Sequence, residues 1–308
     1  MKIIITGALG HIGSRLIRYI SEVFPGSEVV MIDNLISKRF SSIFNLPSKV
    51  KYEFIEADIK KINLDTIFKE ANYVIHLAAI TDAEASFKNA KKVESNNFDC
   101  TNKVAHACID NNVKLVTLSS TSVYGTQKAQ VTEDCSVEEL KPQSPYAETK
   151  LKEEKLIKTL CDSEGLNAVC FRFGTIYGPS SGMRFHTAVN KFCWQATQGK
   201  PLTVWSTAFN QKRPYLDLSD AVRLIEFTIK KDLFDNQIYN ILTENLTVRE
   251  VTEVVKEFIP NLKIDFVDSK IMNQMSYEVS NKKIQDKGFS FEGGIRNGIK
   301  ETISMLPR

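Results

Sequence analysis

The sequence lacks a charge excess and a long apolar run. Lys and Arg number 40 against 37 Asp and Glu, so the formal charge is only +3, and the basic residues are scattered. This balance argues against nucleic acid as a partner. No apolar run approaches the roughly 18 residues of a membrane-spanning helix, and no basic stretch leads into an apolar signal region. We therefore expect a cytoplasmic protein without a membrane partner.

Paired cysteines are also missing. The six cysteines form no Cys-x-x-Cys motif, and none stands near a histidine at metal-ligand spacing. They are typical of reduced, mostly buried thiols, so we expect neither a disulfide framework nor a metal site. The 308 residues are enough for one large α/β domain or for one domain plus a small lobe, without covalent staples.

Apolar runs of strand length alternate with segments of helical apolar spacing. The runs are KIIIT (2–6), EVVMID (28–33), YEFIEAD (52–58), YVIHLAA (73–79), KLVTLSS (114–120) and NAVCFRF (167–173). Strands that are apolar throughout are expected where helices cover both faces of a sheet. The pattern predicts an α/β fold with a doubly wound, mostly parallel sheet.

The regular alternation of strand-like and helix-like segments ends after residue 173. A helix-like TAVNKFCWQATQG, a short PLTVW and a strand-like QIYNIL follow. We interpret this part as a smaller carboxyl-terminal lobe that closes over the sheet edge. Because the chain has no internal repeat or flexible linker, the two parts are expected to share an interface and exchange segments. The predicted division assigns 1–175 and about 212–242 to the sheet domain, and about 176–211 and 243–308 to the lobe.

Three glycines interrupt the chain directly after the first predicted strand, in TGALGHIGS. A doubly wound sheet binds its ligand at this edge. Gly7 would allow a tight turn, Gly10 a close approach of backbone to a pyrophosphate, and Gly13 close packing of helix on strand. No Gly-Lys-Ser/Thr follows, as a P-loop requires. The motif predicts a dinucleotide site, and the alternative is a plain glycine-rich turn.

The second predicted strand ends on Asp33, twenty positions after Gly13. A carboxylate there accepts hydrogen bonds from an adenosine ribose and repels a 2′-phosphate, which favours NAD over NADP. Lys38 and Arg39 follow closely and weaken this preference. Asp58 and Ile59 close the third strand region, near the expected position of the adenine ring.

Tyr146 and Lys150 stand four residues apart on a predicted helix, so their side chains share one face. They follow a strand that ends on Ser119 and Ser120 at the glycine edge of the sheet. An ammonium about 4 Å away would favour a tyrosinate by roughly 4 kcal/mol, an upper bound of about three pKa units. Tyr146 could then remove a hydroxyl proton while Ser120 holds that oxygen in line. The alternative is a surface pair on an amphipathic helix.

With these residues in view, the sequence resembles the extended short-chain dehydrogenase/reductase family, specifically its nucleotide-sugar epimerases and dehydratases. The matching pieces, in order, are TGALGHIGS, DNL, AD before Ile59, HLAA, SSTSVYG, PYAETK, RFGTIYGP and RPYLDLSDA. The resemblance implies a Rossmann domain that binds NAD, a lobe that binds a nucleotide-diphosphate sugar, and a homodimer through the long helices, one of which carries Tyr146. It also implies catalytic roles for Ser120, Tyr146 and Lys150.

The resemblance further assigns residues to the two ligands. At the cofactor it implies Gly7, Gly10, His11, Ile12, Gly13, Asp33, Asn34, Asp58, Ile59, Leu77, Ala78, Ala79, Asn97, Tyr146 and Lys150. At the substrate it implies Thr81, Ser120, Thr121, Tyr146, Thr175, His186 and Arg213. Arg213 matches the arginine that usually binds the substrate pyrophosphate. Asn97 matches a helix asparagine near the nicotinamide, with a buried structural amide as its alternative, and His76 and Tyr177 are interpreted as core groups.

Several positions depart from the family pattern. Thr175 replaces a common Asn that helps to hold the diphosphate, and Asp217 stands where the motif usually has His or Tyr. Thr121 and Ser122 occupy the positions of the Asp-Glu pair of 4,6-dehydratases, which disfavours that reaction. Ser122 also replaces the cysteine of the reductase-epimerases, while His186 could still act as an acid.

The leading hypothesis is an NAD-dependent enzyme that oxidises C4 of a nucleotide-activated sugar, as a UDP-glucose 4-epimerase does. One alternative is an enzyme that carries out only half of this reaction cycle, as a C4 dehydrogenase or 4-ketoreductase. Another, of a different class, is a non-catalytic NAD-binding regulatory protein. Such a protein has no need for the complete set of Ser120, Tyr146 and Lys150.

Overall fold

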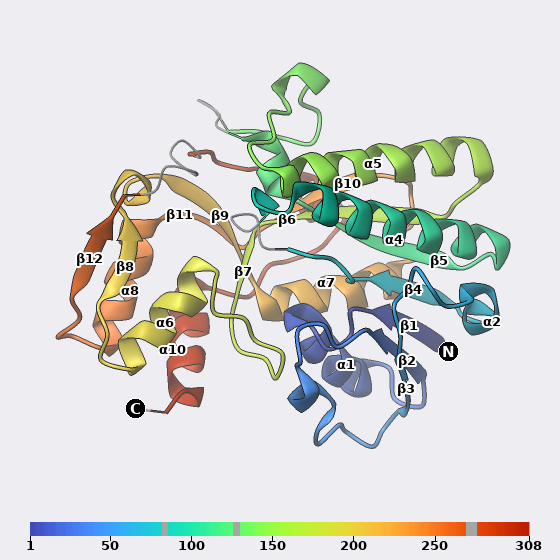
Figure 1. Ribbon diagram of the computed structural model, residues 1–308, viewed down its shortest axis with the longest axis horizontal. Helices are drawn as coiled ribbons and strands as arrows, with labels where there is room; N and C mark the ends of the chain where they lie inside the picture. The colour runs from blue at the N-terminus through green and yellow to red at the C-terminus, as the bar shows by residue number, and fades with distance from the viewer. Residues whose placement is uncertain (82–85, 126–129, 269–275, 308) are drawn as a thin grey trace.

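The computed structural model describes residues 1–81, 86–125, 130–268 and 276–307, and a parallel sheet lies at its centre (Figure 1). This seven-stranded sheet has the order β10-β6-β5-β4-β1-β2-β3, and all neighbouring strands run parallel. Its strands are β1 (Lys2–Thr6), β2 (Glu28–Asp33), β3 (Lys51–Glu56), β4 (Tyr73–His76), β5 (Lys114–Ser120), β6 (Ala168–Phe173) and β10 (Ile238–Ile241). The α/β, Rossmann-like prediction is confirmed, because every apolar run identified in the sequence contributes a strand.

Helices cover both faces of the sheet, as the continuous apolar runs require. Ile3 and Ile5 pack on the face covered by α1 and α7, whereas Ile4 packs on the face covered by α2, α4 and α5. These helices are α1 (His11–Val23), α2 (Leu64–Phe68), α4 (Ala90–Asp110), α5 (Pro145–Glu164) and α7 (Leu218–Lys231). Only β3, at the sheet edge, departs from the expected pattern, because it is largely exposed or half-buried.

The strand order reverses at β1, which lies between β2 and β4. The connections that leave β1 and β4 therefore diverge at the carboxyl edge of the sheet and open a crevice between them. Gly7 follows β1 directly and Leu77 follows β4. The topology brings the glycine-rich segment and the chain after β4 to one place.

The carboxyl-terminal part contributes a separate group of elements beside the sheet, on the left side of Figure 1. It has a three-stranded sheet, β11-β9-β7, and a two-stranded sheet, β12-β8. These strands are β7 (Thr175–Tyr177), β8 (Leu202–Trp205), β9 (Lys212–Asp217), β11 (Glu244–Thr247) and β12 (Ile264–Val267). The helices α6 (Ala188–Thr197), α8 (Val248–Phe258) and α10 (Ile295–Met305) enclose a core of their own. The division at the residue boundaries given above stays a prediction.

Short elements complete the chain: α9 (Lys282–Asp286), η1 (Phe40–Ile43), η2 (Thr121–Tyr124), η3 (Val137–Glu139) and η4 (Ser206–Ala208). Within the described ranges, none of the helices combines the length and the apolar character needed to cross a membrane.

Candidate functional site

Two adjoining cavities, of about 260 and 270 Å³, open at the carboxyl edge of the sheet. We call the first the β2-side cavity, because the ends of β2 and β3 border it, and the second the β5-side cavity, which the end of β5 borders. Both are lined by Gly7, Gly10, Arg39, Leu77, Ala78, Ala79 and Thr81. The crevice expected at the strand-order reversal is therefore present as one continuous site.

The sequence-predicted site residues gather around these cavities, with one exception. The β2-side cavity adds Asp33, Asn34, Asp58, Ile59 and His186 to the shared residues. The β5-side cavity adds His11, Ile12, Gly13, Ser120, Thr121, Tyr146, Lys150, Thr175 and Arg213. The exception, Asn97, is buried and lines neither cavity, but its side chain bonds the backbone N–H and carbonyl of Ile80, which lines the β2-side cavity.

The glycine-rich turn has the geometry of a cradle. Gly7 has a φ of +66°, and a Cβ there would lie 2.7 Å from the backbone nitrogen of Ala78, so a side chain does not fit. Gly10 is the N-cap of α1 and supplies no capping side chain. The first backbone N–H groups of α1 are therefore available to an anion at the positive end of the helix.

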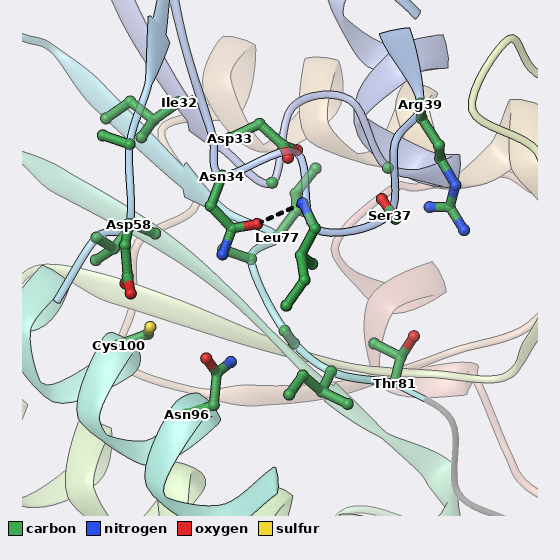
Figure 2. A pocket seen from close by; sticks show the side chains of 18 of the residues that line it. Ile32, Asp33, Asn34, Ser37, Arg39, Asp58, Leu77, Thr81, Asn96 and Cys100 are labelled. Atoms are coloured by element: carbon green, nitrogen blue, oxygen red, sulfur yellow. Dashed lines mark hydrogen bonds between the residues drawn. The ribbon is translucent and has the colours of Figure 1, made fainter. Parts of the chain in front are cut away.

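Asp33 is held by the glycine-rich turn itself. Its carboxylate accepts a hydrogen bond from the backbone N–H of Leu9 at 3.0 Å and another from that of Leu35 at 2.9 Å. Each carboxylate oxygen can accept a second bond, so Asp33 keeps acceptor capacity for a ligand hydroxyl. Figure 2 shows Asp33 at the end of β2, Asp58 just beyond β3 and Arg39 across the same cavity.

Two basic groups border the site, Arg39, which the sequence places close after Asp33, and Arg184, which has no signal in the sequence. Arg39 lines both cavities, and Arg184 lines the β5-side cavity and donates a hydrogen bond to Thr81. Burial, followed by the charges of Arg184 and Arg39, lowers the pKa of His11 to about 3, so its imidazole is neutral. Arg184 could not be found by spacing, because it lies in a loop far along the chain from Thr81.

The loop after β7 folds back over the glycine-rich turn. The backbone N–H of Gly182 donates to Ser14 at 2.8 Å, and the His11 ring nitrogen Nδ1 lies 2.9 Å from the Ser180 hydroxyl. This course brings His186 to the β2-side cavity, whereas the sequence placed it with the substrate residues. His186 therefore borders the cavity that Asp33 also lines.

Ser120 is oriented by its neighbour Ser122. The Ser120 hydroxyl oxygen accepts hydrogen bonds from the backbone N–H of Ser122 at 3.2 Å and from its hydroxyl at 2.9 Å. With these two acceptor sites filled, the group that Ser120 has left to offer is its own O–H. Ser120 is thus set up as a hydrogen-bond donor in the β5-side cavity.

Tyr146 and Lys150 occupy the first turns of α5, which Ser144 caps and Pro145 begins. The Lys150 ammonium is buried, lies 6.0 Å from the centre of the Tyr146 ring and donates to Glu153 at 2.9 Å. Burial alone would lower the pKa of Lys150, but Glu153 and then Tyr146 outweigh it and hold that pKa above its usual value. Lys150 is a fixed cation next to Tyr146.

Arg213 and Tyr177 differ in their access to the site, since the first lines a cavity and the second lies in the core. Arg213 lines the β5-side cavity and donates to Gln211 at 3.2 Å, so its guanidinium can take further acceptors. Tyr177 is fully buried, as the core interpretation requires. In the described part of the chain, no group of three or more His, Cys, Asp or Glu residues is arranged to hold a metal ion.

Comparison with known proteins agrees with this geometry. The model of the NAD dependent epimerase/dehydratase family matches residues 3–241. An uncharacterized UDP-glucose epimerase of Bacillus subtilis, YtcB, is 30% identical over 267 residues, which are 83% of this chain and 82% of that protein.

A larger Arabidopsis thaliana protein is also similar. It is a trifunctional UDP-glucose 4,6-dehydratase/UDP-4-keto-6-deoxy-D-glucose 3,5-epimerase/UDP-4-keto-L-rhamnose-reductase, 28% identical over 98% of this chain but only 46% of that protein. Among solved structures, a mutant UDP-glucuronic acid 4-epimerase from Bacillus cereus, in complex with UDP-4-deoxy-4-fluoro-glucuronic acid and NAD, superposes with a TM-score of 0.90. The two chains are 25% identical, and the match covers 99% and 98% of them. The chain therefore belongs to the NAD dependent epimerase/dehydratase family.

Proposed function

We propose that the protein is an NAD-dependent nucleotide-sugar 4-epimerase that works through a transient 4-keto sugar. The observation that carries this proposal is the convergence of Ser120, Tyr146 and Lys150 on the cavity that adjoins the glycine-rich turn. The relatives support it, because they include a UDP-glucose epimerase and a UDP-glucuronic acid 4-epimerase.

The β2-side cavity fits the adenosine half of NAD. Asp33 has acceptor capacity for ribose hydroxyls, and the N-terminus of α1 with the tight turn at Gly7 suits a pyrophosphate. Asp58 and Asn34 border the same cavity. When bound, NAD supplies a reversible acceptor for the hydrogen and two electrons that leave the sugar carbon.

The chain's own residues handle the sugar hydroxyl. Tyr146 takes the proton from the C4 hydroxyl as the C4–H bond breaks, while the ammonium of Lys150 favours the deprotonated tyrosine. Ser120 donates its O–H to the same sugar oxygen and keeps it in line. After the 4-keto sugar presents its other face, Tyr146 returns the proton, so the cycle needs no proton from solvent.

Arg213 and Thr175 are the residues that we assign to the diphosphate of the substrate, since both line the β5-side cavity. A 4,6-dehydratase would need an acid and a base where Thr121 and Ser122 stand. Here Thr121 donates to the carbonyl of Phe173 at 3.3 Å and Ser122 donates to Ser120. Neither hydroxyl has the acidity for that work.

Two further expectations belong to the same proposal. We place the protein in the cytoplasm, which agrees with six free cysteines, five of them buried. We also expect a homodimer that pairs the long helices α4 and α5, which lie side by side on one face of the sheet. Light scattering during size-exclusion chromatography tests the dimer.

The test is turnover of a panel of UDP-, GDP-, dTDP- and CDP-sugars by purified protein with its cofactor identified. A new C4 epimer without net NADH supports the epimerase. Net NADH formation or consumption instead supports a C4 dehydrogenase or ketoreductase. Absence of turnover across the panel contradicts the proposal and favours a non-catalytic NAD-binding protein.

A further inference from the structure

Glu153 is a buried carboxylate one helical turn beyond Lys150. Both residues are 5% exposed, and the Lys150 ammonium donates to Glu153 Oε2 at 2.9 Å. Ion pairs on a helix are ordinarily solvated, as Lys158 and Asp162 are further along α5, with side chains more than half exposed. Burying a carboxylate away from water costs free energy, which the contacts of Glu153 with Lys150 and its other neighbours must offset.

The carboxylate also ends a directed chain of hydrogen bonds. Thr6 accepts from the backbone N–H groups of Leu77 and Ala78 at 3.2 and 3.3 Å, so its hydroxyl hydrogen is free to go to His76 Nδ1, 2.7 Å away. Burial, followed by the charge of Lys150, lowers the pKa of His76 to about 3 and keeps the ring neutral. The single ring hydrogen of His76 is therefore on Nε2.

From His76 the chain continues in the same direction. Nε2 of His76 lies 3.2 Å from the Thr101 hydroxyl, which donates in turn to Glu153 Oε2 at 3.1 Å. Glu153 Oε2 thus accepts from Thr101 on α4 and from Lys150 on α5. The other oxygen, Oε1, is buried and has no hydrogen-bond partner within the described residues.

The two cysteines nearest this pair stay neutral across the working range of pH. Cys170, on β6, also faces Lys150, and burial raises the pKa of its thiol to about 12. Burial likewise raises the pKa of Cys100, which is close to Glu153, to about 11. His76 on β4 is also neutral, and the buried Glu154 and Arg172 form an ion pair whose charges offset each other. The charges of Lys150 and Glu153 therefore remain beside Tyr146.

We propose that Glu153 is a positioning residue of the catalytic pair, which fixes the Lys150 ammonium and offsets part of its charge, and so sets the pH range in which Tyr146 exchanges its proton. The proposal rests on the proposed function. The Lys150 ammonium lies 6.0 Å from the centre of the Tyr146 ring, so the two groups are close enough for their charges to interact. Removing a nearby negative charge makes proton loss easier for both, so the first proton leaves the pair at lower pH.

The test compares wild-type protein with Glu153→Gln, which keeps the size of the side chain and removes its charge. The pH profile of kcat for the sugar found in the panel is expected to move to lower pH by about one unit. Asp162→Asn, at the exposed pair of the same helix, serves as the matched control and should leave the profile in place. An unmoved profile in Glu153→Gln, or a uniform loss of rate at every pH, overturns the proposal.

A second measurement needs no turnover and separates this proposal from the proposed function. The ultraviolet absorbance of tyrosinate is titrated in wild-type protein and in Tyr146→Phe, and their difference isolates Tyr146. Repeated in the Glu153→Gln background, the midpoint should again fall by about one pH unit. An unchanged midpoint overturns the role of Glu153 even when no substrate is found.

Folding of the variant is checked by thermal unfolding. Should Glu153→Gln not fold, Glu153→Asp takes its place, because it keeps the charge but is one methylene too short for the 2.9 Å contact. A smaller shift in the same direction is expected. If the pH profiles of kcat for Glu153→Asp and for the wild type coincide, the proposal is rejected.

Discussion

The imidazole Nδ1 of His11 lies 2.9 Å from the hydroxyl of Ser180 and so joins the glycine-rich turn to the loop that follows β7. A second contact beside it, from the backbone N–H of Gly182 to Ser14 at 2.8 Å, fastens the same two segments. Asn190, on α6, approaches the other ring nitrogen of His11 at 3.4 Å. The glycine-rich turn and the carboxyl-terminal part are therefore linked at the mouth of the site.

Gly182→Ala should weaken this link. A Cβ at Gly182 would lie 2.6 Å from the carbonyl oxygen of Gly10, so the loop must move away from the turn. We expect NAD affinity to fall about tenfold, or ~1.4 kcal/mol, with unfolding temperature little changed. Isothermal titration with NAD measures the effect. Gly294→Ala is the matched control, because its Cβ would meet nothing closer than Glu244 at 3.7 Å; equal affinities of the two variants contradict the prediction.

Asp33→Asn should alter cofactor choice. The amide oxygen can still accept from Leu9 or Leu35, but the charge that repels a 2′-phosphate is gone, and Arg39 borders the same cavity. We expect NAD to bind about tenfold more weakly and the ratio of NADP to NAD affinity to rise by a similar factor. Asp65→Asn, on α2, should leave both affinities unchanged. A ratio that stays at the wild-type value refutes this role for Asp33.

Tyr146→Phe should abolish turnover without unfolding the protein. The phenyl ring preserves the partly buried packing, but it has no hydroxyl to exchange a proton with the sugar. We expect kcat to fall by at least about a hundredfold while NAD remains bound. Tyr52→Phe is the control, because it removes a hydroxyl that donates to the carbonyl of Ile17, outside the cavities. Turnover in Tyr146→Phe close to that of the wild type would remove Tyr146 from the mechanism.

Asp217→Asn should make stability less sensitive to pH. Burial, partly offset by hydrogen bonds from Ser219 and reinforced by the charge of Asp220, raises the pKa of Asp217 in the folded state. A raised folded pKa favours the protonated form, so its stabilising effect is present at acid pH and is lost as pH rises through that pKa.

The uncharged amide avoids this loss and keeps an acceptor for Ser219. We therefore expect the variant to unfold about 2 °C higher than wild type at pH 8, with the difference vanishing near pH 4. Differential scanning calorimetry at the two pH values decides. A variant that is less stable at pH 8 shows that the ionised carboxylate is needed where it lies.

The fold could be predicted from the sequence because it depends on local patterns of apolar residues. The runs at 2–6 and 28–33 are apolar along their length, and helices on both faces of a parallel sheet are the physical reason. The glycine turn and the Tyr146–Lys150 spacing point to one edge of that sheet. Their convergence on one site follows from the strand order alone.

The parts that the sequence did not reveal depend on contacts between distant segments. Arg184 meets Thr81 only because the loop after β7 folds over the glycine turn, and that same course places His186 in the β2-side cavity. The side chain of Asn97 bonds the backbone of Ile80 and lines neither cavity. The sequence did contain a signal for Glu153, because it stands three residues after Lys150. A charged residue on a helix is, however, ordinarily exposed to solvent.

The chain leaves the central sheet after β6 and returns to it only at β10, after building β7 to β9 elsewhere. During synthesis, β6 therefore remains an open edge until the residues of β10 have emerged from the ribosome. An unpaired edge strand is a template for pairing with other chains. Pairing with β10 is thus the step that covers β6, and truncation of the chain between β6 and β10 would leave β6 permanently unpaired on that side.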